Sequence, residues 1–520
     1  MKTRLLVTFA VFAGVMARAD VRLPSVISDH MVLQAGAMVP VWGRAQPGEE
    51  VTVEFARQSQ TTNAGADGKW LIKLDKLQAS DQAQEMTVQG RNRIIVHDVL
   101  VGEVWLASGQ SNMEMQIKGK EHGSVDHADE EIAAAKHPTL RQFRQDEPFS
   151  IYGITAPPAA SVEDRPGAWH VCSPETAADF SACAYFFARE IQEHVKTPVG
   201  VVTAAVGGTP VEAWTSLPVQ QADPALAAML ADWQKRLAGF DAERDSAAFQ
   251  EAKKAWLKQR SAAVKAGQPA PKAPLPFKNL AVMQPGGLFN GVIAPLIPYA
   301  VRGVIWYQGE RNAAGPFTGL YGEQLTTLIK DWRARWQNDF YFAWVQLPRA
   351  QKEQTLPSEP KGWGVSVRDE MRRTLAVPNT AMAITIDMGG VKEGHPTNKA
   401  DYAHRLALLA LHDVYKQPAE EWTGPLFRSA KTGDGTMVIE FDHGAGLKAA
   451  AGELKGFAIA GADQKFVWAE AKIVDDHVVV SAASVPQPVA VRYGWAGNPH
   501  CNLINAAGLP ASPFRTDDWN

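Results

Sequence analysis

The chain has 520 residues, 46% of them hydrophobic and 21% charged, a composition that excludes a disordered, collagenous or coiled-coil protein. With 52 Lys and Arg against 56 Asp and Glu, the formal net charge is −4. This balance argues against nucleic acid as the main partner, because phosphate binding requires a basic excess. The length predicts about three domains.

The first 19 residues are typical of a signal peptide. Lys2 and Arg4 precede an apolar run over residues 5–16 that is too short to span a bilayer comfortably, and residues 17–19 read Ala-Arg-Ala, a small-x-small cleavage pattern. Cleavage after Ala19 removes three cations and no acidic residue, which shifts the net charge from −4 to −7. We therefore expect a periplasmic or secreted protein with no membrane segment in its mature form.

The chain has three cysteines, and their pairing stays open. Cys172 and Cys183 are close in sequence and could form one disulfide in an oxidising compartment, which would leave Cys501 over. Three buried, reduced cysteines are equally consistent with the sequence. The spacing indicates neither a metal site nor a cysteine nucleophile.

Two β-rich regions flank a region of mixed pattern. Residues 20–100 contain alternating strands, such as 51–55 and 70–74, with turn signals between them and no helical stretch, so we expect a small β-sandwich-like domain. Residues 419–520 are β-like again and predict a second β domain.

Short apolar runs alternate with helical segments over residues 101–418. This order predicts an α/β domain in which a parallel sheet is covered by helices on both faces. The expected strands are 104–107, 199–204, 304–306, 340–347 and 380–387, and the expected helices are 180–195, 321–336 and 398–415. Residues 219–275, rich in Ala, Lys and Gln, interrupt the pattern as a solvated helical insertion without recognisable chemistry.

The loops after the predicted strands carry polar residues that suit acyl transfer. Because the carboxyl ends of parallel strands meet at one edge of a sheet, a serine, backbone N–H groups beside glycine, an amide and a histidine can converge there. Acyl transfer needs that set: a nucleophile, a base and donors for an oxyanion. The four loops are residues 108–113, 207–210, 307–312 and 387–396.

Each of these residues also has a structural interpretation. Ser111 could cap a helix, residues 207–208 could form a tight turn, and Glu310 could pair with the adjacent Arg311. The acidic and His-containing run 121–130 resembles a metal site by composition only. Its spacing fits no standard ligand pattern, so a solvated face is the better interpretation.

Four ordered blocks resemble the sialate O-acetylesterase-like group of the SGNH hydrolase superfamily, a group of carbohydrate acetylesterases. The resemblance spans nearly the whole mature chain and implies an SGNH-type three-layer α/β/α domain flanked by β-sandwich-like regions. The blocks are residues 109–113, 207–210, 306–310 and 395–399, supported by 169–174, 180–182, 185–190, 493–495, 502–503, 508–510 and 513–515.

This resemblance implies a serine esterase that removes O-acetyl groups from carbohydrate through an acetyl-serine intermediate, with no metal or organic cofactor. Ser111 would be the nucleophile and His395 the general base and acid. The expected oxyanion donors are the backbone N–H groups of Ser111 and Gly208 and the side-chain amide of Gln308, with Asn312 as the alternative. The expected substrate contacts are Asn112, Glu310 and Trp214.

The residue that orients His395 has more than one candidate. The superfamily often has Asp three residues before this histidine, whereas this chain has Lys392 there, which cannot accept a proton from the imidazole. Glu393 is the favoured orienting residue, and Asp387 is the alternative. A backbone carbonyl completing a Ser–His dyad stays open.

The sequence leaves alternatives for both the substrate and the class of function. Relatives of this domain plan act on acetylated sialic acid or on plant cell-wall polysaccharides such as xyloglucan, and the sequence does not choose between them. A catalytically silent carbohydrate-binding protein is an alternative from another class. A glycoside hydrolase using Glu310 is a third, but no second carboxylate forms a convincing pair with it. The oligomeric state is open.

Overall fold

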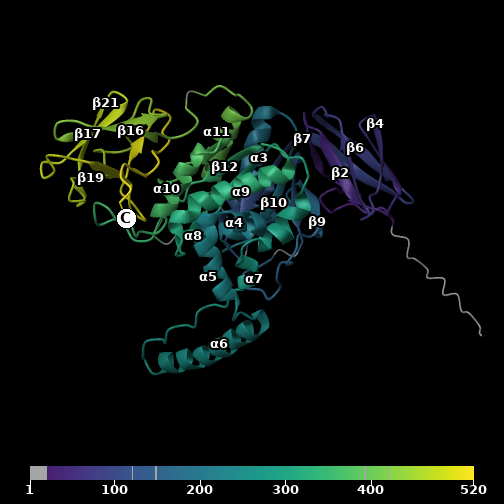
Figure 1. The fold of residues 1–520 in the computed structure, drawn as a ribbon, viewed down its shortest axis with the longest axis horizontal. Coiled ribbons are helices and arrows are strands. Elements are labelled where there is room, and N and C mark those ends of the chain that lie inside the picture. The colour runs from purple at the N-terminus through teal and green to yellow at the C-terminus, as the bar shows by residue number, and fades with distance from the viewer. Residues whose placement is uncertain (1–19, 120, 147–148, 392–393, 420, 520) are drawn as a thin grey trace, which may run out of the picture.

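The computed structural model describes residues 20–119, 121–146, 149–391, 394–419 and 421–519. Three regions follow one another along the longest axis of the molecule: an N-terminal β region, a central α/β region and a C-terminal β region (Figure 1). The predicted signal peptide, residues 1–19, lies outside the described residues. In the part of the chain that is described, no helix is both long and apolar enough to cross a membrane.

The central region contains the predicted parallel sheet. Six strands run parallel, and β9 closes one edge in the antiparallel direction. Every residue of β11 and β12 is buried, as expected for strands that are covered on both faces. The order across the sheet is β14 (Thr380–Ala383), β12 (Tyr341–Val345), β11 (Gly303–Tyr307), β7 (Arg93–Gly109), β10 (Val199–Ala205), β8 (His137–Gln145) and β9 (Gly167–Cys172).

Alternate side chains of the sheet enter two different cores. Trp105 and Ala107 on β7 pack with helices α3 (Ala182–Val195) and α11 (Lys399–Asp413), which contact one another on one face. Val104 and Leu106 point the other way, into the core that holds α9 (Tyr321–Trp336). The chain therefore has the three-layer α/β/α arrangement that the alternating pattern predicted.

The N-terminal β region is continuous with the central sheet through one long strand. The first part of β7 pairs with β1 (Val32–Gln34) and β6 (Ser80–Gln89), and its last part pairs with β10 and β11. The expected domain boundary at residue 100 thus falls inside a strand. The remaining strands of the region are β2 (Val39–Arg44), β3 (Glu50–Phe55), β4 (Gln58–Asn63) and β5 (Lys69–Leu74).

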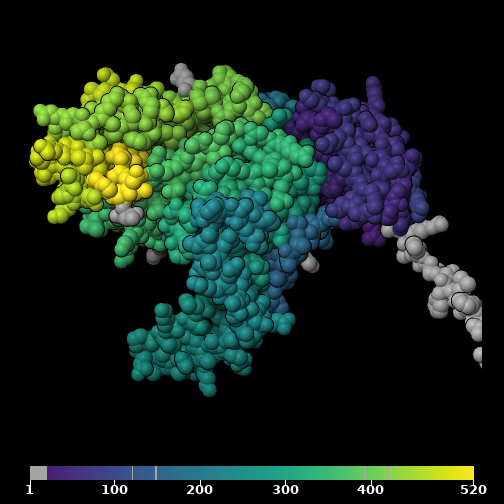
Figure 2. Space-filling view, viewed as in Figure 1, coloured from purple at the N-terminus to yellow at the C-terminus, as the bar shows by residue number. Residues whose placement is uncertain are grey.

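The helical insertion divides into a packed half and a projecting half. Helix α5 (Ala227–Leu237) buries Met229 and Trp233, and the Trp233 indole donates a hydrogen bond of 3.0 Å to Glu212. Helix α6 (Ala242–Lys265) buries no residue and extends away from the body of the molecule (Figures 1 and 2). The prediction of a solvated insertion is therefore correct for α6 and wrong for α5, whose apolar face packs on the core.

The C-terminal region is a sandwich of two four-stranded sheets. Their facing side chains form a separate core that includes Ile439, Val480, Phe457, Val491 and Phe514. One sheet contains β16 (Leu426–Thr432), β17 (Thr436–Asp442), β22 (His477–Ser481) and β21 (Glu470–Val474). The other contains β20 (Val467–Trp468), β19 (Phe457–Ala460), β23 (Ala490–Tyr493) and β25 (Phe514–Arg515).

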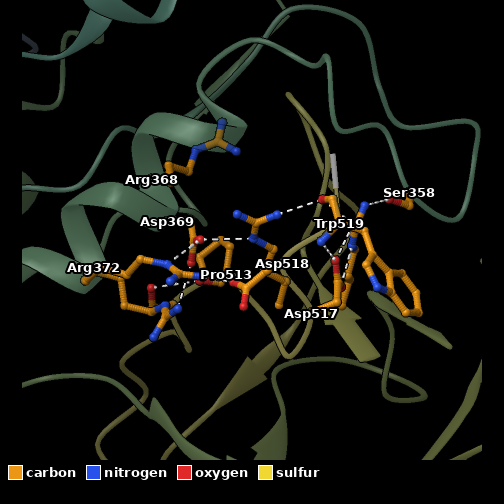
Figure 3. Close-up of polar contacts among 12 residues, drawn as sticks. Ser358, Arg368, Asp369, Arg372, Pro513, Asp517, Asp518 and Trp519 are labelled. Carbon is orange, nitrogen blue, oxygen red and sulfur yellow. Dashed lines mark hydrogen bonds and ion pairs between the residues drawn. The ribbon is translucent and has the colours of Figure 1, made fainter. Parts of the chain in front are cut away.

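Charged side chains fasten this sandwich to helix α10 (Val365–Arg373) of the central region (Figure 3). Asp369 on α10 accepts bonds from Arg372 and Arg373 and one of 3.3 Å from Arg515 of the sandwich. The fully buried Arg368 donates to the carbonyl oxygens of residues 347 and 348 on one side and 496 and 497 on the other. The two regions therefore share buried polar contacts.

The three cysteines are unpaired. Cys172 and Cys183 are buried, and burial raises the pKa of each thiol to about 12. The open question of a disulfide between them is thereby answered in favour of reduced, unreactive thiols.

Candidate active site

The loops after β7, β10 and β11 leave the sheet at the same level. Gly109 pairs with Ala205 of β10 and with Tyr307 of β11, so Ser111, Gly208 and Gln308 follow from neighbouring positions. Gly109 has a φ of +140°, and a Cβ there would lie 2.2 Å from the Tyr307 carbonyl oxygen. Glycine at this position lets the serine turn pass close to the next strand.

Ser111 and His395 meet across 284 residues of sequence. The Nε2 atom of His395 lies 2.8 Å from the Ser111 Oγ, and both residues line a cavity of about 280 Å³. Burial, together with the smaller effects of the nearby His122 and Lys399, lowers the pKa of His395 to about 4. The imidazole is therefore neutral near pH 7, which is the form that accepts a proton from a serine hydroxyl.

Two backbone N–H groups are available beside the Ser111 hydroxyl. Ser111 is the first residue of α1 (Ser111–Glu114), where backbone N–H groups have no partner within the helix. Gly208 lines the same cavity, and its N–H has no acceptor among the residues that the structure describes. Gly208 has a φ of +72°, and a Cβ there would meet Ile151 at 2.4 Å.

The predicted side-chain oxyanion donors lie elsewhere. Gln308 is fully buried, and its Nε2 donates to Gln110 at 3.2 Å, to the Thr209 carbonyl at 3.1 Å and to Asn312 at 2.8 Å. The Asn312 amide donates to Glu212 at 3.0 Å. Both amides hold neighbouring loops together, so the structure does not support either as the third donor to an oxyanion.

Two of the three expected substrate contacts, Trp214 and Asn112, are also buried, and the third, Glu310, is half-buried. Trp214 is fully buried, packs edge-on against Trp306 and donates to Thr209 at 3.0 Å, so it cannot stack on a sugar in this arrangement. Asn112 is 1% exposed, and its amide donates to the carboxylate of Glu310. The prediction of substrate contacts for Trp214, Asn112 and Glu310 is therefore corrected: none of the three belongs to the described lining of the cavity that holds Ser111.

Of the two carboxylates predicted to orient His395, the structure describes only Asp387. Glu393, like Lys392, lies outside the described residues. The Asp387 carboxylate binds Arg405 through both oxygens, at 2.6 Å and 2.7 Å. This bidentate ion pair engages Asp387 with α11 and disfavours it as the partner of His395.

Glu114 and His122 line the cavity and were missed by the sequence analysis. The Glu114 Oε2 accepts a bond of 2.7 Å from the Gly207 N–H and lies 3.0 Å from His122 Nε2, and the rings of His122 and His395 are 4.7 Å apart. Glu114 follows Ser111 by three residues, so its place on the same face of a helical turn was a usable signal. His122 lies in an irregular segment, where no periodicity could reveal it.

The aromatic residues of the cavity were missed as well. Tyr152 is 57% exposed and lines the cavity together with Phe149. Both belong to a segment without regular secondary structure, between β8 and β9. Within the described ranges, no group of three or more His, Cys, Asp or Glu side chains is arranged to hold a metal ion.

Comparison with known proteins identifies the family. Residues 101–241 match the model described as carbohydrate esterase, sialic acid-specific acetylesterase. Sialate O-acetylesterases of Rattus norvegicus and Homo sapiens are 25% and 26% identical to the chain, over 95% of its length and 94% and 92% of theirs. The crystal structure of a carbohydrate acetylesterase from Xanthomonas citri is 33% identical, with a TM-score of 0.78, and the match covers 96% of this chain and 100% of that one. The chain therefore belongs to the sialate O-acetylesterase-like family of SGNH hydrolases and is a carbohydrate O-acetylesterase.

Proposed function

We propose that the chain is a serine esterase that removes acetyl groups from neutral carbohydrate through an acetyl-serine intermediate at Ser111. The observation that carries this proposal is the 2.8 Å contact between His395 Nε2 and Ser111 Oγ at the wall of a cavity. A neutral imidazole in hydrogen-bond contact with a serine hydroxyl is the arrangement that activates a nucleophile.

In the proposed acylation step, Ser111 Oγ attacks the acetyl carbonyl carbon while His395 Nε2 takes the hydroxyl proton. The backbone N–H groups of Ser111 and Gly208 stabilise the negative oxygen of the tetrahedral intermediate. His395 then returns its proton to the sugar oxygen as the ester bond breaks. A water molecule, deprotonated by His395, hydrolyses the acetyl-serine and restores the hydroxyl.

We assign Glu114 to the oxyanion site as a positioning residue. Its carboxylate accepts the Gly207 N–H and so fixes the peptide that leads to Gly208. Because Glu114 belongs to the same helical turn as Ser111, the nucleophile and the Gly208 donor are held by one short segment. Glu393 remains the residue that we propose to orient His395, since Asp387 is engaged by Arg405.

Charge at the cavity favours a neutral sugar. Its described lining contains the carboxylates of Glu114 and Glu121 and no Lys or Arg. An adjoining cavity of about 380 Å³ shares both and adds Asp146 and Asp179, with Arg144 as its one described cation. A substrate that carries its own carboxylate would be repelled there. Acetylated neutral wall polysaccharides such as xyloglucan avoid this repulsion, and two adjoining cavities suit a substrate longer than one sugar.

Acetylated sialic acid is the second candidate, because the curated relatives are sialate O-acetylesterases. The test is release of acetate from acetylated xyloglucan, xylan, pectin and sialic acid at equal acetyl concentration. The proposal expects xyloglucan or xylan to have the highest kcat/KM. A higher value for sialic acid would overturn the neutral-sugar assignment and leave the serine mechanism intact.

We also propose that the chain is exported and cleaved after Ala19. The basic start, the short apolar run and the Ala-Arg-Ala sequence support this. Mass measurement of the protein from the extracellular or periplasmic fraction tests it: a mature chain that starts at Asp20 is expected. An intact Met1 in that fraction would contradict the proposed cleavage.

A further inference from the structure

Lys399 occupies an unusual place for a lysine. It is the first residue of α11, and its side chain is fully buried. A cation is unfavourable at the N-terminus of a helix, where the helix dipole is positive, and burial of an ammonium group costs solvation. Burial lowers the pKa of Lys399 to about 8. A lysine that is both at a helix N-terminus and buried is unfavourable for two independent reasons, and such positions are expected at functional sites.

The Lys399 ammonium connects the histidine loop to the serine turn. Its Nζ donates to the Asn112 Oδ1 at 2.9 Å and also to the carbonyl oxygen of Pro396. Asn112 directly follows Ser111, and Pro396 directly follows His395. One buried cation therefore contacts both segments that carry the proposed catalytic pair.

Asn112 makes a second link between the same two segments. Its Nδ2 donates to the carbonyl oxygen of Gly394 at 3.3 Å and to the carboxylate of Glu310. The carbonyl groups on both sides of His395, those of Gly394 and Pro396, are thus each held by a side chain of this group. His395 is fixed through its backbone from both directions.

Glu310 closes the group from the loop after β11. Burial raises the pKa of its carboxyl, while Asn112 and the positive charge of Lys399 act in the opposite direction. Its Oε2 is buried and has no hydrogen-bond partner among the described residues. The rings of Tyr307 and Tyr402 lie 5.9 Å and 5.5 Å from the Lys399 Nζ and favour its charged form.

We propose that Lys399, Asn112 and Glu310, named here the Lys399 cluster, are positioning residues that hold the His395 loop at hydrogen-bond distance from Ser111. The inference rests on the proposed function, because it assigns a task to the groups around Ser111 and His395. The cluster holds the backbone on both sides of His395, in addition to the orienting role proposed for Glu393 at the imidazole. None of its three residues belongs to the cavity lining, as far as the structure describes those walls, so the cluster acts on the chemical step and not on substrate binding.

The central test is Lys399→Met, which keeps the length of the side chain and removes its hydrogen bonds. A misplacement of about 1 Å between reacting groups costs about 100-fold in rate, so we expect kcat on a small aryl acetate to fall about 100-fold. KM is expected to stay within about threefold, because uniform binding is untouched. Labelling of Ser111 by a serine-directed phosphonate is expected to slow in parallel.

The matched control is Lys416→Met, the same substitution just beyond the other end of α11, where the lysine is exposed and bonds only to the Asp413 carbonyl oxygen among the described residues. It is expected to keep full activity. In a His395→Ala background, Lys399→Met should cause no further loss, because the loop no longer carries the base. A further loss of similar size in that background would indicate general damage and overturn the proposal.

Two outcomes separate this inference from the proposed function. If Ser111→Ala retains wild-type turnover, the proposed function fails. If Ser111→Ala is inactive while Lys399→Met keeps kcat within about threefold, only the positioning role fails. Should Lys399→Met not fold, as judged by its thermal melt, Asn112→Ala removes the links to Gly394, Lys399 and Glu310 and leaves the charges of Lys399 and Glu310 in place. It is expected to give the same fall in kcat at unchanged KM, and an unchanged kcat would overturn the proposal.

Discussion

In the loops that carry Ser111 and His395, adjacent residues have different roles, depending on whether they face the cavity or the interior. Ser111 and His395 line the cavity, whereas Asn112 and Pro396, the residues that follow them, belong to or contact the Lys399 cluster behind it. The cavity side holds the groups assigned to chemistry, and the buried side holds hydrogen bonds that fix the loops relative to one another. Neighbouring polar residues of one motif therefore have different roles: a side chain that points into the cavity can take part in the reaction, and one that points into the interior can position the loop.

The largest expected effect comes from the cavity side. Ser111→Ala and His395→Ala are each expected to lower kcat for a small aryl acetate at least about 1,000-fold, because each removes an essential member of the nucleophile–base pair. The double variant should be no worse than either single variant, since the two groups act as a unit. Additive losses would contradict that unit.

The next effect tests whether Glu114 supports the oxyanion site. Glu114→Ala removes the acceptor of the Gly207 N–H and frees the peptide before Gly208. We expect kcat to fall about 100-fold, similar to the loss of one oxyanion donor, with the melting temperature close to that of the wild type. A matched control is Glu121→Ala, which removes the other described carboxylate of the cavity; the Gly207 N–H donates to Glu114 and not to Glu121. Equal losses in both variants would refute the positioning role of Glu114.

The pH dependence of kcat/KM tests the environment of His395. Protonation of the imidazole removes its ability to accept the Ser111 proton, so activity falls as the pH drops through the pKa of His395. Because burial lowers that pKa to about 4, the acid limb is expected near pH 4 and not near the ordinary value of about 6.5. A midpoint at or above pH 6.5 in a folded protein would contradict a pKa set by burial and would show that solvent or a carboxylate, Glu393 included, stabilises the charged imidazole.

A smaller effect is expected from Tyr152, the exposed aromatic residue of the cavity. Tyr152→Ala removes a surface on which a sugar ring can stack, so KM for the polysaccharide is expected to rise about two- to tenfold. The kcat on a small aryl acetate should remain unchanged, because that substrate does not reach the ring. Tyr152→Phe is the matched control and should retain the wild-type KM.

The smallest effect is expected at the projecting helix. Replacement of residues 242–272 by a short Gly/Ser linker removes α6, which buries no residue, and the rings of Phe240 and Phe277 lie 6.4 Å apart at its base. We expect the free energy of unfolding to change by less than about 0.5 kcal/mol and kcat to stay within about twofold. A large loss of activity on polysaccharide alone would assign a substrate contact to α6.

The helices and strands were predictable from the periodicity of apolar residues. The contact between Ser111 and His395 was predictable because the loops that follow parallel strands lie at one edge of the sheet. Helix α9 coincides with the predicted residues 321–336, and the sheet contains the five expected strands together with β8 and β9, which were not predicted. The placement of Gln308, Asn312, Asn112 and Glu310 outside the described cavity lining was not predictable. It depends on side-chain direction within tight turns, where no repeating pattern applies, and on a lysine whose burial contradicts its polarity.

Residues in segments without regular secondary structure were also not predictable as cavity residues. Glu121, His122 and Tyr152 enter the cavity from stretches without helical or strand periodicity, so their place depends on tertiary contacts alone. The β7 strand shows the same limit for domain boundaries: composition changes near residue 100, yet the backbone continues as one strand to Gly109.

The central claim is the acetyl-serine intermediate at Ser111, and mass analysis of the protein quenched during turnover tests it most directly. The account predicts one acetyl group on the peptide that carries Ser111, at a level that rises with substrate and disappears in Ser111→Ala. An acetyl group on another residue, or turnover by the wild type with no acetylated Ser111 and retained turnover in Ser111→Ala, would contradict the account.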